Sequence, residues 1–291
     1  MPYLFLVISV FCMASSSVCG GYFNRRTANN KDQTALFNFI RTLCMLIFYC
    51  VYYAFDFSFA PKVLLYSLAI GVGFSLCTVA YIYALKNGTV ALTSLVFQSS
   101  LIGVTIWGLI FWNAPLTVTV GLGIGLVAVG LALCILSPKK AEEKNKTVSF
   151  KWFLWAFLAF FGNAVSTIAQ REQQLAFDGK HGSMLMVFAL LIATIFCFIL
   201  FLKSDKSESK LVFKKHWAFP VSAGIMNALL NVFVIILATS KLSPSLIYPV
   251  LAVGGLMVSM LFSLFAFKEK LKWWQWVGFF IGAVAIALIN L

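Results

Sequence analysis

Long apolar stretches without charged residues, separated by short charged connections, run through the whole chain. They cover residues 1–24, 33–55 with Arg41 inside, 63–85, 87–138, 152–170, 182–202, 217–240, 242–267 and 273–291. Most are close to or above the roughly 20 residues that a helix needs to cross a hydrocarbon core. The stretch 87–138 is too long for one span, and the turn at 112–115, which ends in a helix-starting proline, divides it in two. The pattern therefore predicts an all-α integral membrane protein with ten transmembrane helices.

Composition supports the same fold class. Of 291 residues, 62% are hydrophobic and 11% are charged, which is more apolar surface than a soluble domain of this length can bury. Alternation with a period of two, the mark of a β-barrel strand, is absent. The seven cysteines lie in apolar stretches without CxxC spacing, and the two histidines lie at stretch ends. We therefore expect cysteines that pack, no metal site and no cofactor.

A unit of helix, tight turn and glycine-rich helix occurs twice in the chain. An offset of 155 residues places Leu116 on Leu271 and Gly123 on Gly278. The charged linker 137–149 follows the fifth helix, so the predicted parts are a first five-helix repeat at 1–136, a basic cytoplasmic linker at 137–149 and a second repeat at 150–291. Because five is odd, the second repeat enters the membrane from the opposite side, which makes the repeats inverted.

Basic residues concentrate in one alternate set of connections. The connections between helices 1–2, 3–4, 5–6, 7–8 and 9–10 hold 17 Lys and Arg residues, whereas the other side holds Lys62, Arg171, Lys180 and Lys241. The positive-inside rule places the first set in the cytoplasm and both termini outside. The formal net charge of +13 is thus explained by orientation in the membrane rather than by nucleic-acid binding.

Three short motifs stand at particular places in this ten-helix pattern. They are an arginine in the second helix (Asn38-Phe39-Ile40-Arg41), the end of the third helix (Tyr83-Ala84-Leu85-Lys86) and the turn Phe267-Lys268-Glu269-Lys270-Leu271 followed by Gly278. With two halves of five helices, these motifs resemble the drug/metabolite transporter superfamily, in its EamA-type branch. The resemblance covers nearly the whole chain.

The resemblance implies a secondary transporter of small organic solutes. It implies a substrate cavity between the halves, lined by helices of the bundle centre, with helix pairs 4–5 and 9–10 as a supporting scaffold. Two features depart from the family pattern. The family's glutamate matches Glu269 in the 9–10 turn, but Ala114 stands at the equivalent place in the 4–5 turn. Many members are described with cytoplasmic termini, whereas the charges here indicate the reverse.

A polar stripe on the sixth helix supplies the first candidate site residues. Asn163, Ser166, Thr167, Gln170 and Gln174 fall at i, i+3, i+4, i+7 and i+11, which places them on one face. Facing lipid, their amides would be unpaired at a cost of a few kcal/mol each. The stripe therefore faces either a substrate cavity or a neighbouring helix, where small polar side chains form interhelical hydrogen bonds.

Other polar side chains within the spans are further candidates for lining the cavity. Asn227 and Asn231 lie four residues apart on the eighth helix and share a face, and an amide suits a polar, uncharged or zwitterionic solute. The alternative is again structural hydrogen bonding. Ser94 and Gln98 of the fourth helix and Tyr81 of the third helix are weaker candidates, because tyrosines near span ends often anchor a helix at the membrane interface. Tyr248 lies inside its span next to Pro249 and is favoured over Tyr81.

Two ionisable residues stand out. Arg41 lies eight residues inside the second span, where a charge costs a few kcal/mol or more and indicates a function. It either binds a carboxylate or phosphate of the substrate or locks its helix by reaching carbonyl groups or the basic side. Glu172, at the end of the sixth helix, is the candidate coupling carboxylate; a surface salt bridge with Arg171 or Lys180 is the alternative.

The predicted function is secondary active transport of a small polar organic metabolite, of amino acid, nucleoside or amine type, across the plasma membrane by alternating access. Two alternatives stay open. A facilitative channel-like pore would show rings of like charge or a filter loop. A membrane-embedded enzyme acting on lipid-linked substrates would need carboxylate or histidine pairs, and the chain offers only scattered Asp56, Asp178 and His181, so no catalytic residue is expected.

The expected partners are a small-molecule solute and the lipid bilayer, with no nucleic acid, and the chain is expected to act as a monomer or homodimer. The expected location is a bacterial inner or plasma membrane. No GxxxxGK[ST] motif is present, so direct use of ATP is not expected.

The orientation is testable by cysteine accessibility. A single reporter cysteine at Lys144 is expected to be shielded from an impermeant thiol reagent in intact cells, because the charge rule places the linker inside. A reporter at Lys180 is expected to react. The reverse result would place both termini in the cytoplasm.

Overall fold

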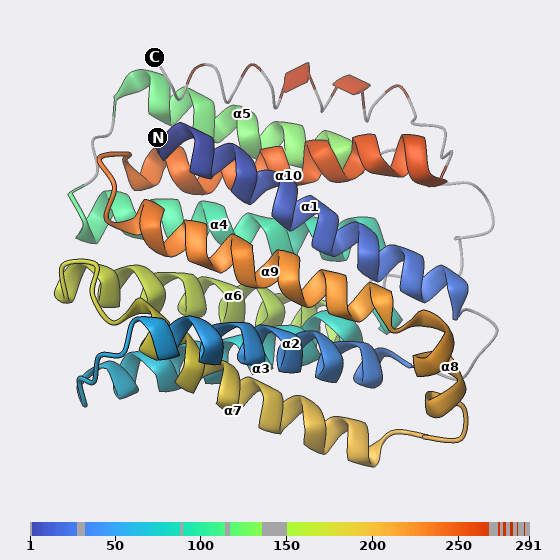
Figure 1. Cartoon of the computed structure of the whole chain (residues 1–291). Coiled ribbons are helices and arrows are strands. Elements are labelled where there is room, and N and C mark those ends of the chain that lie inside the picture. The colour runs from blue at the N-terminus through green and yellow to red at the C-terminus, as the bar shows by residue number, and fades with distance from the viewer. Residues whose placement is uncertain are drawn as a thin grey trace. The chain divides into compact units, whose positions relative to one another are not determined.

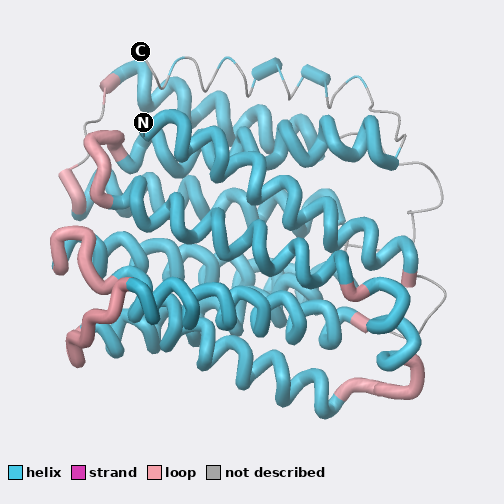
Figure 2. Tube along the Cα trace, viewed as in Figure 1, coloured by secondary structure: helices cyan, strands magenta, loops and turns pink. Residues whose placement is uncertain are grey.

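A computed structural model of the chain is helical throughout the part that it describes, and contains no strand there. That part comprises residues 2–27, 33–87, 90–113, 117–135 and 150–267, together with 273, 276–277, 280–281, 284 and 288. Figure 1 labels the helices along the chain, and Figure 2 shows the short loops between them. In chain order they are α1 (Pro2–Arg26), α2 (Thr34–Phe55), α3 (Val63–Asn87), α4 (Val90–Phe111), α5 (Val118–Ile135), α6 (Phe150–Ala176), α7 (Gly182–Lys203), α8 (Ser209–His216), α9 (Ala218–Ala238) and α10 (Pro244–Phe267).

Within the described residues, every predicted span from the first to the ninth corresponds to a helix. The short helix α8 lies in the basic connection before the eighth predicted span, so α9 and α10 are the eighth and ninth spans. Six helices contain segments that are long and apolar enough to cross a membrane, and the apolar segments Ser99–Phe111 and Pro244–Gly255 are shorter. The predicted tenth span, 273–291, falls largely outside the described residues. The protein is therefore a multi-pass membrane protein, and the count of ten stays a prediction.

The chain forms two compact units that do not follow the predicted repeats. The first contains Tyr3–Ser75 and Ala169–Ser240, and the second contains Leu76–Ile168 and Lys241–Leu291. Each unit therefore combines helices from both halves of the sequence. Two helices, α3 and α6, begin in one unit and end in the other. The division into repeats at 1–136 and 150–291 stays a prediction, because spatial contacts rather than internal similarity define these units.

In the first unit α2 packs against both α7 and α9. Small residues permit the close approach. A methyl group on Gly224 of α9 would lie 2.7 Å from the carbonyl oxygen of Arg41, and one on Gly71 of α3 would lie 2.9 Å from that of Ala189 on α7. In a bilayer, where the lipid is as apolar as the side chains, such close packing is what drives helices together.

Hydrogen bonds from side chains to backbone carbonyls of other helices add to this packing. Ser67 of α3 donates to the carbonyl oxygen of Leu185 at 3.0 Å, and the Tyr49 hydroxyl of α2 donates to that of Ala228 at 3.3 Å. Each bond satisfies a hydroxyl that lipid could not pair. The first unit is thus held by close backbone contacts and by hydroxyls that pair across helices.

In the second unit α4 packs against α10. A methyl group on Gly108 of α4 would lie 2.9 Å from Cβ of Pro244, the first residue of α10. Tyr248 is almost fully buried, and its ring centroid lies 6.3 Å from that of Trp112. Pro249, inside α10, does not interrupt the helix. Close packing at Gly108 and the contact of the buried Tyr248 with the half-buried Trp112 therefore hold the two helices together.

The turn between α6 and α7 is tight and depends on left-handed backbone conformations. Gly179 has φ +78°, and Asp178 and His181 have φ of 50° and 62°. Glycine adopts this region without strain, and aspartate and histidine are among the side chains that tolerate it. The turn brings the end of α6 beside the start of α7, where the cavity described below lies.

The role of close helix contact is testable with a pair of glycine substitutions. Gly71→Ala places a methyl group 2.8 Å from Cβ of Ile192, so the helices must separate and the melting temperature in detergent should fall, with a loss on the order of 1–3 kcal/mol. Gly121 on α5 has no such neighbour within 4 Å, so Gly121→Ala should leave the melting temperature unchanged or slightly raised. Equal behaviour of the two variants would contradict the packing argument.

Candidate functional site

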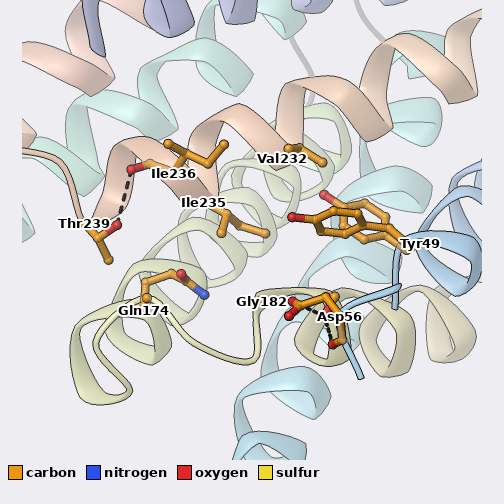
Figure 3. Close-up of a pocket in the computed structure, with 11 residues that line it drawn as sticks. Tyr49, Asp56, Gln174, Gly182, Val232, Ile235, Ile236 and Thr239 are labelled. Carbon is orange, nitrogen blue, oxygen red and sulfur yellow. Dashed lines mark hydrogen bonds between the residues drawn. The ribbon is translucent and has the colours of Figure 1, made fainter. Parts of the chain in front are cut away.

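A cavity of about 160 Å³ lies in the first unit, where several helices end. Helices α2, α6 and α9 end at it and α7 begins at it, as the close-up in Figure 3 shows. The eleven lining residues are Tyr49, Tyr52, Asp56, Gln174, Gly179, Gly182, Ser183, Val232, Ile235, Ile236 and Thr239. Apolar walls with a few converging polar groups are typical of a small-molecule site.

Asp56 supplies the only formally charged side chain among these eleven residues. It follows α2 directly as its C-cap and is exposed. Ser183, in the first turn of α7, donates from its hydroxyl to Oδ2 of Asp56 at 3.1 Å and lies 3.4 Å from the Asp56 carbonyl oxygen. An ionised carboxylate has room for about four hydrogen bonds. The side chain therefore keeps acceptor capacity toward the cavity.

Two buried glutamines form a relay of amide groups at the end of α6. Gln173 donates from Nε2 to the carbonyl oxygen of Lys180 at 2.9 Å, which leaves its Oε1 as an acceptor. Gln174 donates from Nε2 to that oxygen. Both residues are 0% exposed, and Oε1 of Gln174 has no hydrogen-bond partner. The relay fixes the orientation of both amides and leaves Oε1 of Gln174, a residue that lines the cavity, buried and without a hydrogen bond.

Gly182 leaves the space in which this amide lies. A methyl group on it would lie 3.2 Å from Nε2 of Gln174 and 3.0 Å from Cγ2 of Ile235. Figure 3 shows the Gln174 amide pointing from α6 toward Gly182 and Ile235. A larger residue at 182 would fill the cavity and displace the amide.

The wall formed by α2 carries two tyrosines. Tyr49 is 0% exposed and Tyr52 is 43% exposed, and their ring centroids lie 6.3 Å apart in an edge-to-face arrangement. Tyr49, Tyr52 and Asp56 are spaced i, i+3 and i+7, so one face of α2 presents all three. This spacing is the sequence signal that could have indicated the cavity, and the sequence prediction did not use it.

The residues of the predicted polar stripe on α6 differ in whether their side chains are hydrogen-bonded. Asn163 donates from Nδ2 to the Ser100 hydroxyl on α4 at 2.6 Å, and Ser166 donates to the carbonyl oxygen of Gly162 at 2.9 Å. Gln170 is 6% exposed, and its Nε2 has only the sulfur of Met186, 3.9 Å away and a weak acceptor, as a hydrogen-bond partner. Asn163 therefore matches the interhelical alternative, whereas Gln170 keeps unused hydrogen-bonding capacity.

The asparagines of α9 are half-buried and bonded to each other. Asn231 donates from Nδ2 to the carbonyl oxygen of Asn227 at 2.8 Å and to its Oδ1 at 3.1 Å. This arrangement uses the Asn231 donors within the helix. The Nδ2 group of Asn227 has no hydrogen bond to another described residue.

The two ionisable candidates lie in the first unit. Arg41 is half-buried, and its guanidinium carbon lies 5.8 Å from the ring centroid of Phe74 on α3, within cation–π range. Glu172 is half-buried near the end of α6. Neither residue lines the cavity.

The remaining candidates belong to the second unit. Tyr81 packs its ring at 5.0 Å from that of Phe97, and Tyr248 is buried against Trp112. Ser94 and Gln98 lie on α4, outside the residues whose side chains are described. The structure therefore shows aromatic packing for the two tyrosines.

The described residues contain no group of three or more His, Cys, Asp or Glu side chains that could hold a metal ion. Among them, Cys12, Cys19, Cys44, Cys50, Cys77 and Cys197 are free thiols. The arrangement of the cavity is thus one of hydrogen-bonding groups and aromatic rings.

Comparison with known proteins identifies the family. A solved structure titled "Crystal structure of protein" shares 12% identity and superposes with a TM-score of 0.71 over 99% of this chain and 95% of the other, which shows a common fold. No curated protein matches the chain. The sequence model of the EamA-like transporter family, whose members are membrane transporters of the drug/metabolite type and generally not enzymes, matches residues 1–136 and 150–291. The chain belongs to the EamA-like transporter family.

Proposed function

We propose that the protein is a secondary active transporter that moves a small polar organic metabolite, of amino acid, nucleoside or amine type, by alternating access. The proposed location is a bacterial inner or plasma membrane. Family membership supports transport, and the finer assignment of substrate class and mechanism rests on the amides within the spans.

The observation that carries this proposal is the unused hydrogen-bonding capacity of buried amides. Gln170 and Gln174 are 6% and 0% exposed on a helix that is otherwise mostly apolar. If they served only to join helices, their donors and acceptors would be paired with other helices, as the Nδ2 donor of Asn163 is. Buried polar groups with spare capacity cost free energy and are retained where a ligand completes them.

The packing of equivalent helices supports alternating access. The contacts between α2 and α7 and between α4 and α10 join the second span to the seventh and the fourth span to the ninth. These are the helices that a repeat of five spans makes equivalent. In transporters with inverted repeats, one repeat moves against the other around a fixed site, and contacts between equivalent helices suit such a movement.

The proposal is tested in liposomes that contain the purified full-length chain. A thermal-shift screen of amino acids, nucleosides and amines first identifies a solute that binds, and that solute is then measured for uptake and counterflow. Saturable uptake with counterflow is expected, because a carrier binds its solute at a limited number of sites. Uptake that rises linearly without saturation would favour a channel-like pore.

Two substitutions separate solute binding from folding. Asn227→Ala and Gln170→Met each remove one amide, so KM is expected to rise about fivefold per lost hydrogen bond to the solute. The melting temperature should change little, because Asn231 keeps its hydrogen bond to the Asn227 carbonyl oxygen and Gln170 has only the weak Met186 contact to lose. Asn163→Ala is the matched contrast: it breaks the bond to Ser100 and should lower the melting temperature. Unfolding of the first two variants would assign those amides to structure.

A further inference from the structure

The cavity at the ends of α2, α6, α7 and α9 collects hydrogen-bond acceptors and negative charge. We propose that it binds the ammonium group of a small organic amine. The claim that this amine is also the solute carried rests on the proposed transport function, whereas the binding site stands on the geometry of the cavity alone.

The cavity contains one buried hydrogen-bond acceptor without a donor, Oε1 of Gln174. The carbonyl oxygen of Lys180 fixes Gln173, and Gln173 fixes Gln174, so the oxygen cannot exchange places with the amide nitrogen without breaking the relay. A buried acceptor without a hydrogen bond destabilises the protein, because the group has lost its hydration without gaining a partner. An ammonium group donates up to three hydrogen bonds and can satisfy this oxygen.

Asp56 supplies the charge that complements a cation. Its carboxylate accepts one side-chain hydrogen bond, from Ser183, and no lysine, arginine or histidine is among the eleven lining residues. Ser183 and Gly182 are adjacent in the chain, and Gly182 lies against the Gln174 amide. The start of α7 thus places the carboxylate and the amide oxygen on the wall of one cavity.

Helix termini strengthen the negative potential. Helices α2, α6 and α9 end at the cavity, and each C-terminus carries a partial charge of about −0.5, against about +0.5 at the start of α7. A carboxylate after the C-terminus of a helix is electrostatically unfavourable for that helix. The position of Asp56 is therefore not explained by the stability of α2 and suits attraction of a cation.

The size and the walls of the cavity indicate which organic group is attached to the ammonium nitrogen. A volume of about 160 Å³ is close to the roughly 150 Å³ of an engineered cavity that holds benzene. Tyr49, Tyr52 and Ile235 offer aromatic and aliphatic surface, and aromatic faces also attract cations. An alkylammonium ion with about four to six carbon atoms fits these properties.

The site is tested by calorimetric titration of the purified full-length protein with three probes of similar size. Butylammonium carries both charge and N–H donors, tetramethylammonium carries charge alone, and 1-butanol carries neither charge nor ammonium donors. Butylammonium is expected to bind most tightly and 1-butanol most weakly. Equal affinities for butylammonium and 1-butanol, or no saturable binding of butylammonium, would overturn the proposal.

A matched pair of substitutions tests the role of the carboxylate. Asp56→Asn keeps the shape and the bond with Ser183 but removes the charge, so the affinity for butylammonium should fall about tenfold or more while that for 1-butanol stays the same. Asp178→Asn removes a charge from the neighbouring turn, outside the lining of the cavity, and should change neither affinity. A tenfold loss in both variants would show a general effect of charge and refute the site.

The melting temperature of Asp56→Asn distinguishes a binding role from a structural one. It should be unchanged or slightly raised, because the substitution removes an unfavourable charge from the end of α2. A marked decrease would assign Asp56 to stabilising the start of α7 instead. Binding of butylammonium without its transport leaves the site in place and refutes its role in transport; transport of another solute without butylammonium binding refutes the site alone.

Discussion

Hydrocarbon offers no hydrogen-bonding partner, so every polar group within a span must be paired inside the protein. Serine and threonine meet this constraint locally: Thr42, Ser75 and Thr105 each donate to the carbonyl oxygen four residues earlier in their own helix. Glutamine is too long and carries too many donors and acceptors for this solution. Residues such as Gln170 and Gln174 therefore need hydrogen-bond partners outside their own helix. The candidate site is recognised by amides for which the protein supplies too few such partners.

The same constraint explains why small residues stand at helix contacts. Lipid tails are as apolar as the side chains, so the hydrophobic effect does not drive helices together in a bilayer. Helix association there depends on close packing and on hydrogen bonds between polar groups of different helices. Gly71, Gly108 and Gly224 provide the first, and Ser67 and Tyr49 provide the second. The second unit uses the same combination, with Gly108 as the close contact and the Asn163–Ser100 hydrogen bond as the pairing.

The sequence predicts the helices well, because uncharged length is the property that the bilayer selects. The apolar stretches mark the helix ends less well: the sixth stretch stops at residue 170, whereas α6 continues past Arg171 and Glu172 to Ala176, as the polar stripe to Gln174 requires. The short helix α8 is missed for a related reason. With basic residues throughout and only eight residues, it resembles a connection.

The cavity is less predictable than the helices. The spacing of Tyr49, Tyr52 and Asp56 places them on one face of α2, and this can be seen in the sequence. That Gln174 lines the same cavity depends on how the helices pack, and the spacing of residues along one helix does not predict this packing. The stripe on α6 correctly identifies residues whose amides need partners, yet it does not separate Asn163, which bonds to another helix, from Gln170, which does not. Only tertiary contacts make that distinction.

Helix α6 runs without a proline from Phe150 to Ala176 and belongs to both units. Asn163 and Gln174 lie eleven residues apart on it, or about 16 Å along the axis at 1.5 Å per residue. Polar side chains of a single continuous helix therefore meet two different needs: Asn163 pairs with Ser100 of α4, whereas Gln174 lines the cavity.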